Sequence, residues 1–354
     1  MYFNVIYFIK IHNMSFCIVL KKSEGMIVAN YEYYRFSKEM RDELKPLYQS
    51  NNYRGILGIL YDYAMIAFAI VLSEFHIAFY ILSLLIIGSR QRALATILHD
   101  ASHLCLAKSK KLNRLLGTYF SGYLIGQEFH IYQDSHVKGH HMHLGNPSKD
   151  PDYQYHLEVG LYELRDHQHF FYKYVLRPLF LLNIFSYAVY VFKHRMLQIT
   201  KYPKQYAKMI VMWLVICGVL LYFGLFMHLI LYWVIPYFTA FMVIGWFIEI
   251  AEHYPLMLNH KKSIQMTRNR FSHWIEAFFL SIHAENYHLT HHLQASIPYW
   301  NIAKAHRVMM KDATYAKLNH KMGGVFFSSN HNDPLIKDLI RNQKLPIQQM
   351  RENG

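Results

Sequence analysis

The sequence predicts an all-α membrane protein with four transmembrane helices in two hairpins and a helical cap on the cytoplasmic side. Three observations predict this fold class. Hydrophobic residues make up 53% of the 354 residues and charged residues only 17%, whereas soluble domains carry roughly 25% charged residues. Residues 209–248 contain no Asp, Glu, Lys or Arg. All 37 Lys and Arg residues lie outside two strongly apolar regions.

Both apolar regions are long enough for a helical hairpin. A membrane helix needs about 20 apolar residues, so residues 209–248 fit two spans and a tight turn. The second region runs from Ile56 to Ile87 and is interrupted by a polar turn. The expected spans lie at about residues 56–73, 76–98, 209–227 and 230–251.

The distribution of basic residues predicts the orientation in the membrane. Lys and Arg collect on the cytoplasmic side of membrane proteins, and here they occupy only the segments that flank or separate the two apolar regions. We therefore expect a multi-pass protein with cytoplasmic termini, and we explain the net charge of +14 by topology rather than by nucleic-acid binding. The expected divisions are a cytoplasmic or interfacial segment at 1–54, a membrane domain at 55–310 and a cytoplasmic tail at 311–354.

One shorter apolar stretch, residues 179–192, does not fit the pattern of spans. Its 14 residues favour an interfacial or re-entrant segment over a crossing. An odd number of additional spans between residues 142 and 208 would place later parts of the chain on the opposite side of the membrane.

Three histidine-rich motifs, HDASH, HVKGHH and NYHLTHH, lie on the predicted cytoplasmic side. Residues i and i+4 of a helix point in directions about 40° apart, so such a pair of histidines can bind one metal ion. The three histidines of the third motif share one helix face, and His141 points about 100° away from His140 and could serve a second metal. The motifs contain His99 and His103, then His136, His140 and His141, then His288, His291 and His292.

A fourth element, EIAEHYP, ends the last expected span and adds His253 one turn after Glu249. Eight or nine imidazoles suit two metal ions, and imidazole binds iron, copper or zinc. The three cysteines form no CxxC motif, which excludes a thiolate zinc site, an iron–sulfur cluster and a disulfide framework. The cap is therefore predicted to hold a metal site built from histidines.

These motifs resemble the three histidine boxes of the integral-membrane fatty acid desaturase and hydroxylase superfamily. The resemblance covers roughly residues 55–310 and extends to HLGNPSKDPD after the second box and to HHLQASIPYWNIAKAH around the third. It implies a non-haem centre of two Fe2+ ions that is held by the eight histidines, with O2 as co-substrate. His253 matches a further histidine that family members often use.

The resemblance also suggests roles for carboxylates near the histidine motifs. Some family members have an asparagine that binds iron through water one turn before the additional histidine, and this chain has Glu249 there instead. Asp100, Glu252 and Glu285 are candidates for orienting the imidazoles through their ring nitrogens, because they lie beside the motifs.

The activity that the resemblance implies is an O2-dependent desaturation of an acyl or lipid substrate. A hydroxylase or ketolase acting on a lipid or carotenoid-like substrate is the alternative within the superfamily. A membrane metal-binding or transport protein is the alternative from another class, and it predicts ligands along the spans. No HPGG haem motif or GxGxxG nucleotide loop occurs, so a separate electron donor is implied, namely a ferredoxin, a rubredoxin or a cytochrome b5 with its reductase.

Overall fold

The computed structural model describes residues 5–11, 14–20, 32–163, 166–196, 199–259 and 262–341. The chain divides into two compact units, Met1–Asn30 and Tyr31–Gly354. The smaller unit contains an antiparallel hairpin of β1 (Val5–Ile11) and β2 (Met14–Leu20), whose β-branched and aromatic residues favour strands. The prediction of an all-α fold does not anticipate this hairpin. In the larger unit the described residues form helices joined by loops, as predicted.

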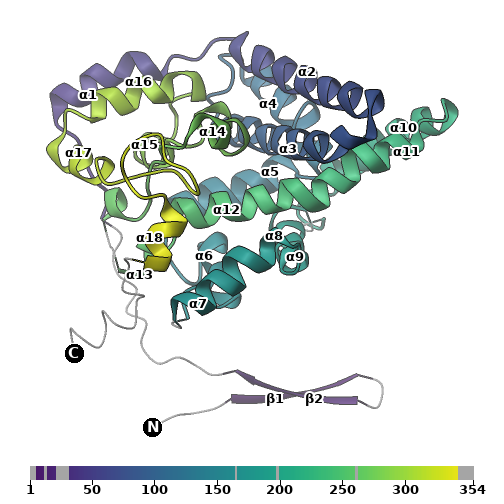
Figure 1. Cartoon of the computed structure of the whole chain (residues 1–354), viewed down its shortest axis with the longest axis horizontal. Helices are drawn as coiled ribbons and strands as arrows, with labels where there is room; N and C mark the ends of the chain where they lie inside the picture. The colour runs from purple at the N-terminus through teal and green to yellow at the C-terminus, as the bar shows by residue number, and fades with distance from the viewer. Residues whose placement is uncertain are drawn as a thin grey trace. The chain divides into compact units, whose positions relative to one another are not determined.

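Among the described residues of the larger unit, four helical segments are long and apolar enough to cross a membrane, which is the number that the sequence predicts. They are α2 (Arg54–Phe75), η2 with α3 (Ile77–Phe79 and Tyr80–Ser102), α10 (Pro203–Tyr222), and the run of α11 (Phe226–Leu229), η8 (Ile230–Val234), η9 (Tyr237–Phe241) and α12 (Met242–His253). Figure 1 shows α2 packed along α3 and α10 turning directly into α11. Helix α10 begins ahead of the apolar run because a proline is accepted in the first turn of a helix.

The outer faces of these helices are apolar and exposed. On α10, Leu214 is 67% exposed and Tyr222 is 85% exposed. On α2, Phe68 and Phe75 are exposed as well. Monomeric soluble proteins rarely expose contiguous apolar surface on this scale, so these faces are suited to contact with lipid.

The inner faces pack closely and keep buried charges paired. A Cβ on Gly88 would lie 2.4 Å from the Cβ of Ala240, so this glycine allows α3 and η9 to touch. The fully buried carboxylate of Asp62 on α2 lies 2.8 Å from Nε2 of His283 and 3.6 Å from the guanidinium of Arg90. These partners satisfy a charge that would be costly inside the membrane.

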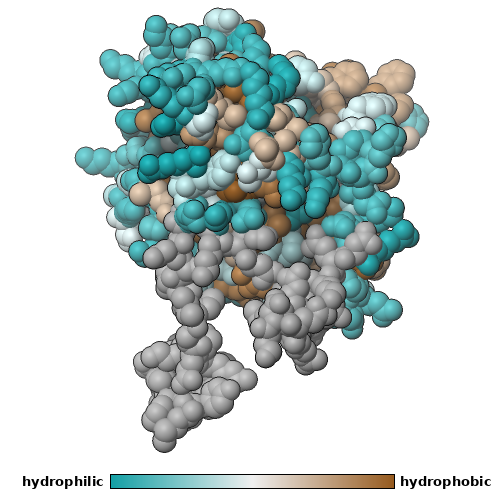
Figure 2. All heavy atoms as spheres, turned by 90° about the vertical axis from the view of Figure 1, so that its left-hand side faces the viewer, coloured by the Kyte–Doolittle hydropathy of each residue, from teal (hydrophilic) through white to brown (hydrophobic). Residues whose placement is uncertain are grey.

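The remaining helices lie outside the four segments. They are α1 (Lys38–Leu44), η1 (Lys45–Tyr48), α4 (Lys110–Tyr119), η3 (Gly122–Ile125), α5 (Phe129–Tyr132), the π-helix η4 (Gln133–His140), η5 (His141–His143), α6 (Pro151–Glu158), α7 (His167–Phe170), η6 (Phe171–Leu176), α8 (Arg177–Leu179), α9 (Ile184–Val191), η7 (Phe192–Met196), α13 (Leu256–Asn259), η10 (Ser263–Gln265), α14 (Trp274–Leu280), η11 (Ile282–Ala284), α15 (His288–Leu293), α16 (Tyr299–Met309), α17 (Ala313–Asn319) and α18 (Leu335–Arg341). In Figure 1, α1, α16 and α17 lie at the end opposite the turn between α10 and α11. Figure 2 views that end and shows a mostly hydrophilic face.

One further apolar pair of helical segments is bent. His167–Leu179 and Ile184–Arg195 meet at 74°, which is the geometry of a broken span or of a re-entrant loop. The pair contains the stretch for which the sequence predicts an interfacial or re-entrant segment.

Candidate metal centre

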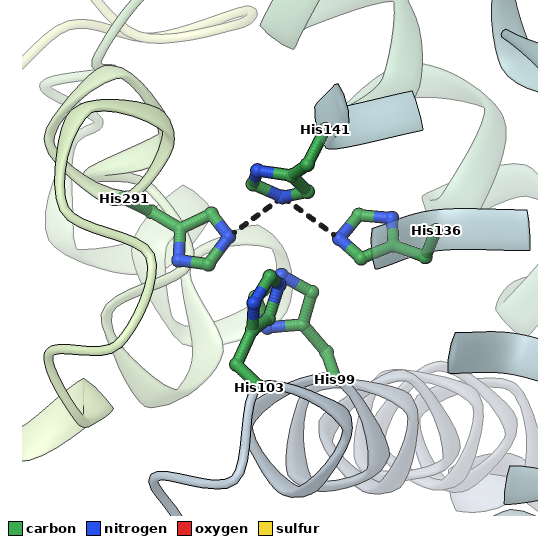
Figure 3. A group of neighbouring side chains, drawn as sticks. All are labelled: His99, His103, His136, His141 and His291. Atoms are coloured by element: carbon green, nitrogen blue, oxygen red, sulfur yellow. Dashed lines mark hydrogen bonds between the residues drawn. The ribbon is translucent and has the colours of Figure 1, made fainter. Parts of the chain in front are cut away.

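Nine histidine side chains converge in two adjoining groups near the ends of α3 and α12. Within each group, one ligand atom from each ring lies within 4.8 Å of all the others. The first group contains His99, His103, His136, His141 and His291 (Figure 3), and the second contains His140, His253, His288 and His292. The rings of His141 and His292 stack with their centroids 4.2 Å apart, so the groups adjoin. The structure brings together all nine predicted histidines, while their binding of metal stays a prediction.

The ring nitrogens of each group face one another. In the first group, Nε2 of His141 lies 3.1 Å from Nε2 of His136 and 3.0 Å from Nε2 of His291. In the second group, Nε2 of His288 lies 2.9 Å from Nε2 of His253. Imidazole lone pairs at this separation repel unless a proton or a cation lies between them. Converging nitrogens of this kind are suited to hold iron, zinc or copper.

The π-helix η4 decides which histidines of the second motif act together. The backbone N–H of His141 donates to the carbonyl of His136, five residues earlier, so these two residues stack along the helix. His136 and His141 therefore lie in the first group, and His140 lies in the second. The separation of His141 from His140 agrees with the expectation from the sequence. The separation of His136 from His140 does not follow from α-helical spacing.

Helix α15 divides its histidines in a similar way. His288 and His292, four residues apart, lie in the second group, whereas His291 lies in the first. All six residues of α15 are buried. The sequence predicts that all three histidines lie on one helix face. In the structure, these histidines belong to two neighbouring groups.

Burial keeps most of these imidazoles neutral. Outside the membrane-spanning segments, it lowers the pKa of six of them well below the usual 6.5, and the neighbouring histidines lower it further. These six are His103, His136, His141, His288, His291 and His292. Neutral rings have a lone pair available for a metal ion.

The pKa of His140 shifts in the opposite direction because two carboxylates face its other nitrogen. Burial lowers its pKa, but Asp150 and Asp152 outweigh this effect and raise the pKa to about 9. Nδ1 of His140 lies 3.0 Å from Oδ1 of Asp150 and 3.5 Å from Oδ2 of Asp152. A metal ion at Nε2 must displace a proton from this ring at neutral pH.

Sequence reasoning missed Asp150 and Asp152. Metal-binding histidines usually donate their second N–H to a carboxylate or a carbonyl, and the DPD triplet in HLGNPSKDPD was the available signal. Asp152 is held in turn by Arg195, whose Nη2 lies 3.0 Å away, and by the hydroxyl of Tyr190. The second motif and this triplet therefore act as one unit.

Two of the four predicted carboxylates contact the histidine groups. Oδ1 of Asp100 lies 3.2 Å from Nδ1 of His99, and Oε1 of Glu252 lies 3.4 Å from Nδ1 of His288. Both are placed to accept the ring N–H and thereby turn Nε2 toward the centre of the group. The corresponding partner of Nδ1 of His253 is the backbone carbonyl of Met266.

Glu249 and Glu285 form no hydrogen bond or ion pair with the nine histidines in the part of the chain that is described. Glu285 forms an ion pair with Arg92. Glu249 accepts a hydrogen bond from the hydroxyl of Tyr187 at 2.7 Å. A contact of Glu249 with a metal through water stays a prediction.

A small cavity adjoins both groups. Its volume is about 90 Å3, and several of the nine histidines line it. Arg92, Gln127, Glu249 and Glu285 form part of its remaining wall. The cavity gives a small molecule access to the place where the ring nitrogens converge.

Comparisons with known proteins agree with this arrangement. The family model of the fatty acid desaturases matches residues 75–323. A dihydrorhizobitoxine desaturase of Bradyrhizobium elkanii is 34% identical over an alignment of 336 residues that covers 92% of this chain and 95% of the relative. The resemblance to this superfamily is thus confirmed, and the chain belongs to the fatty acid desaturase family, a family of desaturase-type oxidoreductases.

Proposed function

We propose that each histidine group holds one iron ion and that the chain is an O2-dependent di-iron desaturase. The observation that carries this proposal is the convergence of nine imidazoles in two adjoining groups. The donor set consists of nitrogen atoms that suit iron, copper or zinc. Membership of the desaturase family favours iron among these metals.

When bound, the two irons supply the activation of O2 and the oxidation of an unactivated C–H bond. In the balanced reaction, a –CH2–CH2– unit loses two hydrogen atoms and becomes –CH=CH–. These hydrogens combine with O2, two electrons and two protons to form two water molecules. The family implies an acyl or lipid chain as substrate, whereas the bacterial relative is named for dihydrorhizobitoxine.

The protein's own residues prepare the ligands for this chemistry. Asp150 holds a proton at Nδ1 of His140, so that Nε2 is the nitrogen that would bind a metal ion of the second group once that ion has displaced its proton. Burial of the groups excludes bulk water and strengthens every electrostatic contact within them.

We infer that the metal centre and both termini lie on the cytoplasmic side. The two spans α10 and Phe226–His253 separate His141 from His253 in the chain, and two crossings return the chain to the same side. A complete third crossing by the bent pair would place these two histidines on opposite sides of the membrane. We therefore propose that the bent pair enters and leaves the membrane from one side. The distribution of Lys and Arg supports the cytoplasmic orientation. A reporter fused after Gly354 should report a cytoplasmic location, and an external signal would contradict this topology.

We propose that the electrons come from a separate ferredoxin, rubredoxin or cytochrome b5 with its reductase. The net charge of +14 supports docking of an acidic carrier, because complementary charge speeds association. Association should therefore weaken as the salt concentration rises.

Mass spectrometry of the product tests the reaction. Iron-loaded protein is incubated with O2, a reduced ferredoxin and candidate substrates of both classes. Loss of two hydrogen atoms supports the desaturase, and gain of one oxygen atom supports the hydroxylase or ketolase instead. A product of neither kind from protein that contains two irons would contradict the proposal.

The metal-transport alternative is less well supported. A transport path needs ligands along the membrane spans. The nine histidines instead gather near one end of the spans, within the described residues. Metal uptake by vesicles that contain the protein would favour transport.

A further inference from the structure

A second cavity lies away from the metal centre and is lined mainly by α4 together with the first turns of α10. Its volume is about 460 Å3, and none of the nine histidines lines it. Four basic side chains do, namely Lys110, Lys111 and Arg114 on α4 and Lys208 on α10. We term this cavity the basic groove. Its charges are not explained by the binding of metal.

The four cations of the basic groove are exposed and unpaired. None of them forms an ion pair or a side-chain hydrogen bond within the described part of the chain. Arg114 follows Lys110 by four residues and Lys111 by three, so these three charges lie on one side of α4. Like charges at these spacings repel and destabilise a helix. A bound anion would relieve this repulsion.

The carboxylate of Glu128, which also lines the groove, does not cancel this charge. It is fully buried, and three donors already occupy its oxygens. Oε2 accepts from the backbone N–H groups of His130 and Ile131 at 2.8 and 2.9 Å, and Oε1 lies 2.9 Å from Nδ1 of His130. One carboxylate against four cations leaves the groove with an excess of positive charge.

The groove lies where the surface of α10 changes from charged to apolar. Lys208 directly precedes residues 209–248, which contain no charged side chain. Ile210 and Val211, in the next turn of α10, are apolar and exposed. Basic side chains beside exposed apolar ones are typical of segments at the level of lipid headgroups. The basic groove is therefore placed at the membrane surface, on the side where α3 ends beside the metal centre.

The lining of the groove is amphiphilic. Leu115, Tyr119 and Tyr123 add apolar surface beside the cations. This mixture suits a ligand with an anionic head and an apolar chain better than a purely water-soluble anion. An acidic protein is also a poorer fit, because a stable contact between proteins buries about 800 Å2 on each partner, whereas this groove has the size of a headgroup.

We propose that the basic groove binds an anionic phospholipid, with its phosphate among the four cations and its acyl chains along the exposed apolar face of α10. Basic pockets beside membrane spans bind phospholipid headgroups in this way. The lipid would contact α4, which follows the first hairpin, and α10, which begins the second, and would thus hold the two hairpins together. This inference depends neither on iron nor on the proposed reaction.

Addition of lipids to the purified full-length protein in detergent tests the proposal. The probes are dioleoylphosphatidylglycerol, the zwitterionic dioleoylphosphatidylcholine with the same acyl chains, and inorganic phosphate. A ligand of the folded state raises the melting temperature, and native mass spectrometry counts the bound lipid. We expect phosphatidylglycerol alone to raise the melting temperature and to stay bound as one molecule per chain. An equal rise with phosphatidylcholine or with phosphate would overturn the proposal.

Two double variants locate the lipid. Arg114→Gln with Lys208→Gln removes one cation from each wall, and Lys110→Gln with Lys111→Gln removes two from α4. Each should weaken phosphatidylglycerol binding by about tenfold to thirtyfold, because one basic residue near a membrane surface contributes about fivefold. Without lipid, both should melt no lower than the unaltered protein, since fewer like charges repel. Unchanged lipid affinity in both variants would overturn the assignment.

A matched control separates the groove from the net charge. Lys304→Gln with Arg307→Gln removes the same two kinds of charge from exposed positions on α16 and should bind phosphatidylglycerol as the unaltered protein does. A loss of affinity equal to that of the groove variants would overturn the proposal, because lipid binding would then follow net charge alone.

Binding of an acidic ferredoxin to the same variants distinguishes a lipid site from a docking site for the electron carrier. We expect the groove variants and the control to bind the ferredoxin alike. Weaker ferredoxin binding by the groove variants, with their lipid affinity unchanged, would overturn the lipid site and identify the groove as the docking site of the carrier.

Discussion

Asp150→Asn tests how strongly the second motif depends on the carboxylate behind it. The carboxylate of Asp150 is fully buried and has four donors around its two oxygens. Oδ1 faces Nδ1 of His140 at 3.0 Å and accepts from the backbone N–H groups of Asp152 and Tyr153. Oδ2 accepts from the backbone N–H of Gly145 at 2.8 Å. An amide replaces one of these oxygens with a donor, so at least one N–H faces another N–H.

The expected magnitude follows from these contacts. Replacing the partner of a metal-binding histidine typically costs about tenfold to hundredfold in metal affinity, or about 1.4 to 2.8 kcal/mol. A second effect opposes this loss at neutral pH. The carboxylate raises the pKa of His140 to about 9, so a proton competes with the metal at pH 7, and the amide relieves part of this competition. The full loss of metal affinity should therefore appear at about pH 9.5, and the loss should be smaller at pH 7.

Competition of the protein with a chelator for Fe2+, under anaerobic conditions at both pH values, measures this effect. Asp166→Asn is the matched control, because Asp166 is an exposed residue at the N-terminus of α7 that accepts from the backbone N–H of His169 at 2.7 Å. Asparagine serves well at this position of a helix, so the control should keep the iron affinity. An unchanged affinity of Asp150→Asn at both pH values would refute the role of this carboxylate.

Three further predictions address the centre and the packing of the helices. His140→Ala should lower the iron content from two ions per chain to about one, measured by metal analysis, whereas the neighbouring His143→Ala, which belongs to neither group, should keep both. The melting temperature of the iron-free protein should fall as pH falls below 6.5, because six histidines with lowered pKa bind protons in the unfolded chain but not in the folded one. A flat profile from pH 7 to 5 would contradict this. Gly88→Ala should destabilise the protein by about 1 to 3 kcal/mol because its Cβ would meet Ala240 at 2.4 Å, whereas Gly218→Ala, with open space around the added Cβ, should not lower the melting temperature in detergent.

The helical spans could be predicted from the sequence because their signal is local. Long apolar runs specify the helices, and the absence of Lys and Arg from residues 56–87 and 209–248 indicates that both hairpins open to the same side of the membrane. The start of α10 at Pro203 could not be predicted from hydropathy, because its first residues are polar. The hairpin β1–β2 could not be predicted from hydropathy, because a short apolar run fits a strand and a helix segment equally well.

The members of the candidate site could be predicted from the sequence, but not their grouping. Each motif brings its histidines into one turn of helix, which sequence spacing reports directly. The assignment of His136 and His140 to different groups depends on the π-helical turn of η4, which has no clear signal in the sequence. The roles of Glu249 and Glu285 depend on contacts between segments far apart in the chain, so proximity to a motif was a poor guide to them.

An iron-edge anomalous difference map from crystals of the iron-loaded protein tests the central claim most directly. The account predicts two peaks, one among His99, His103, His136, His141 and His291 and one among His140, His253, His288 and His292. A single peak in fully loaded protein, or iron bound away from both groups, would contradict it.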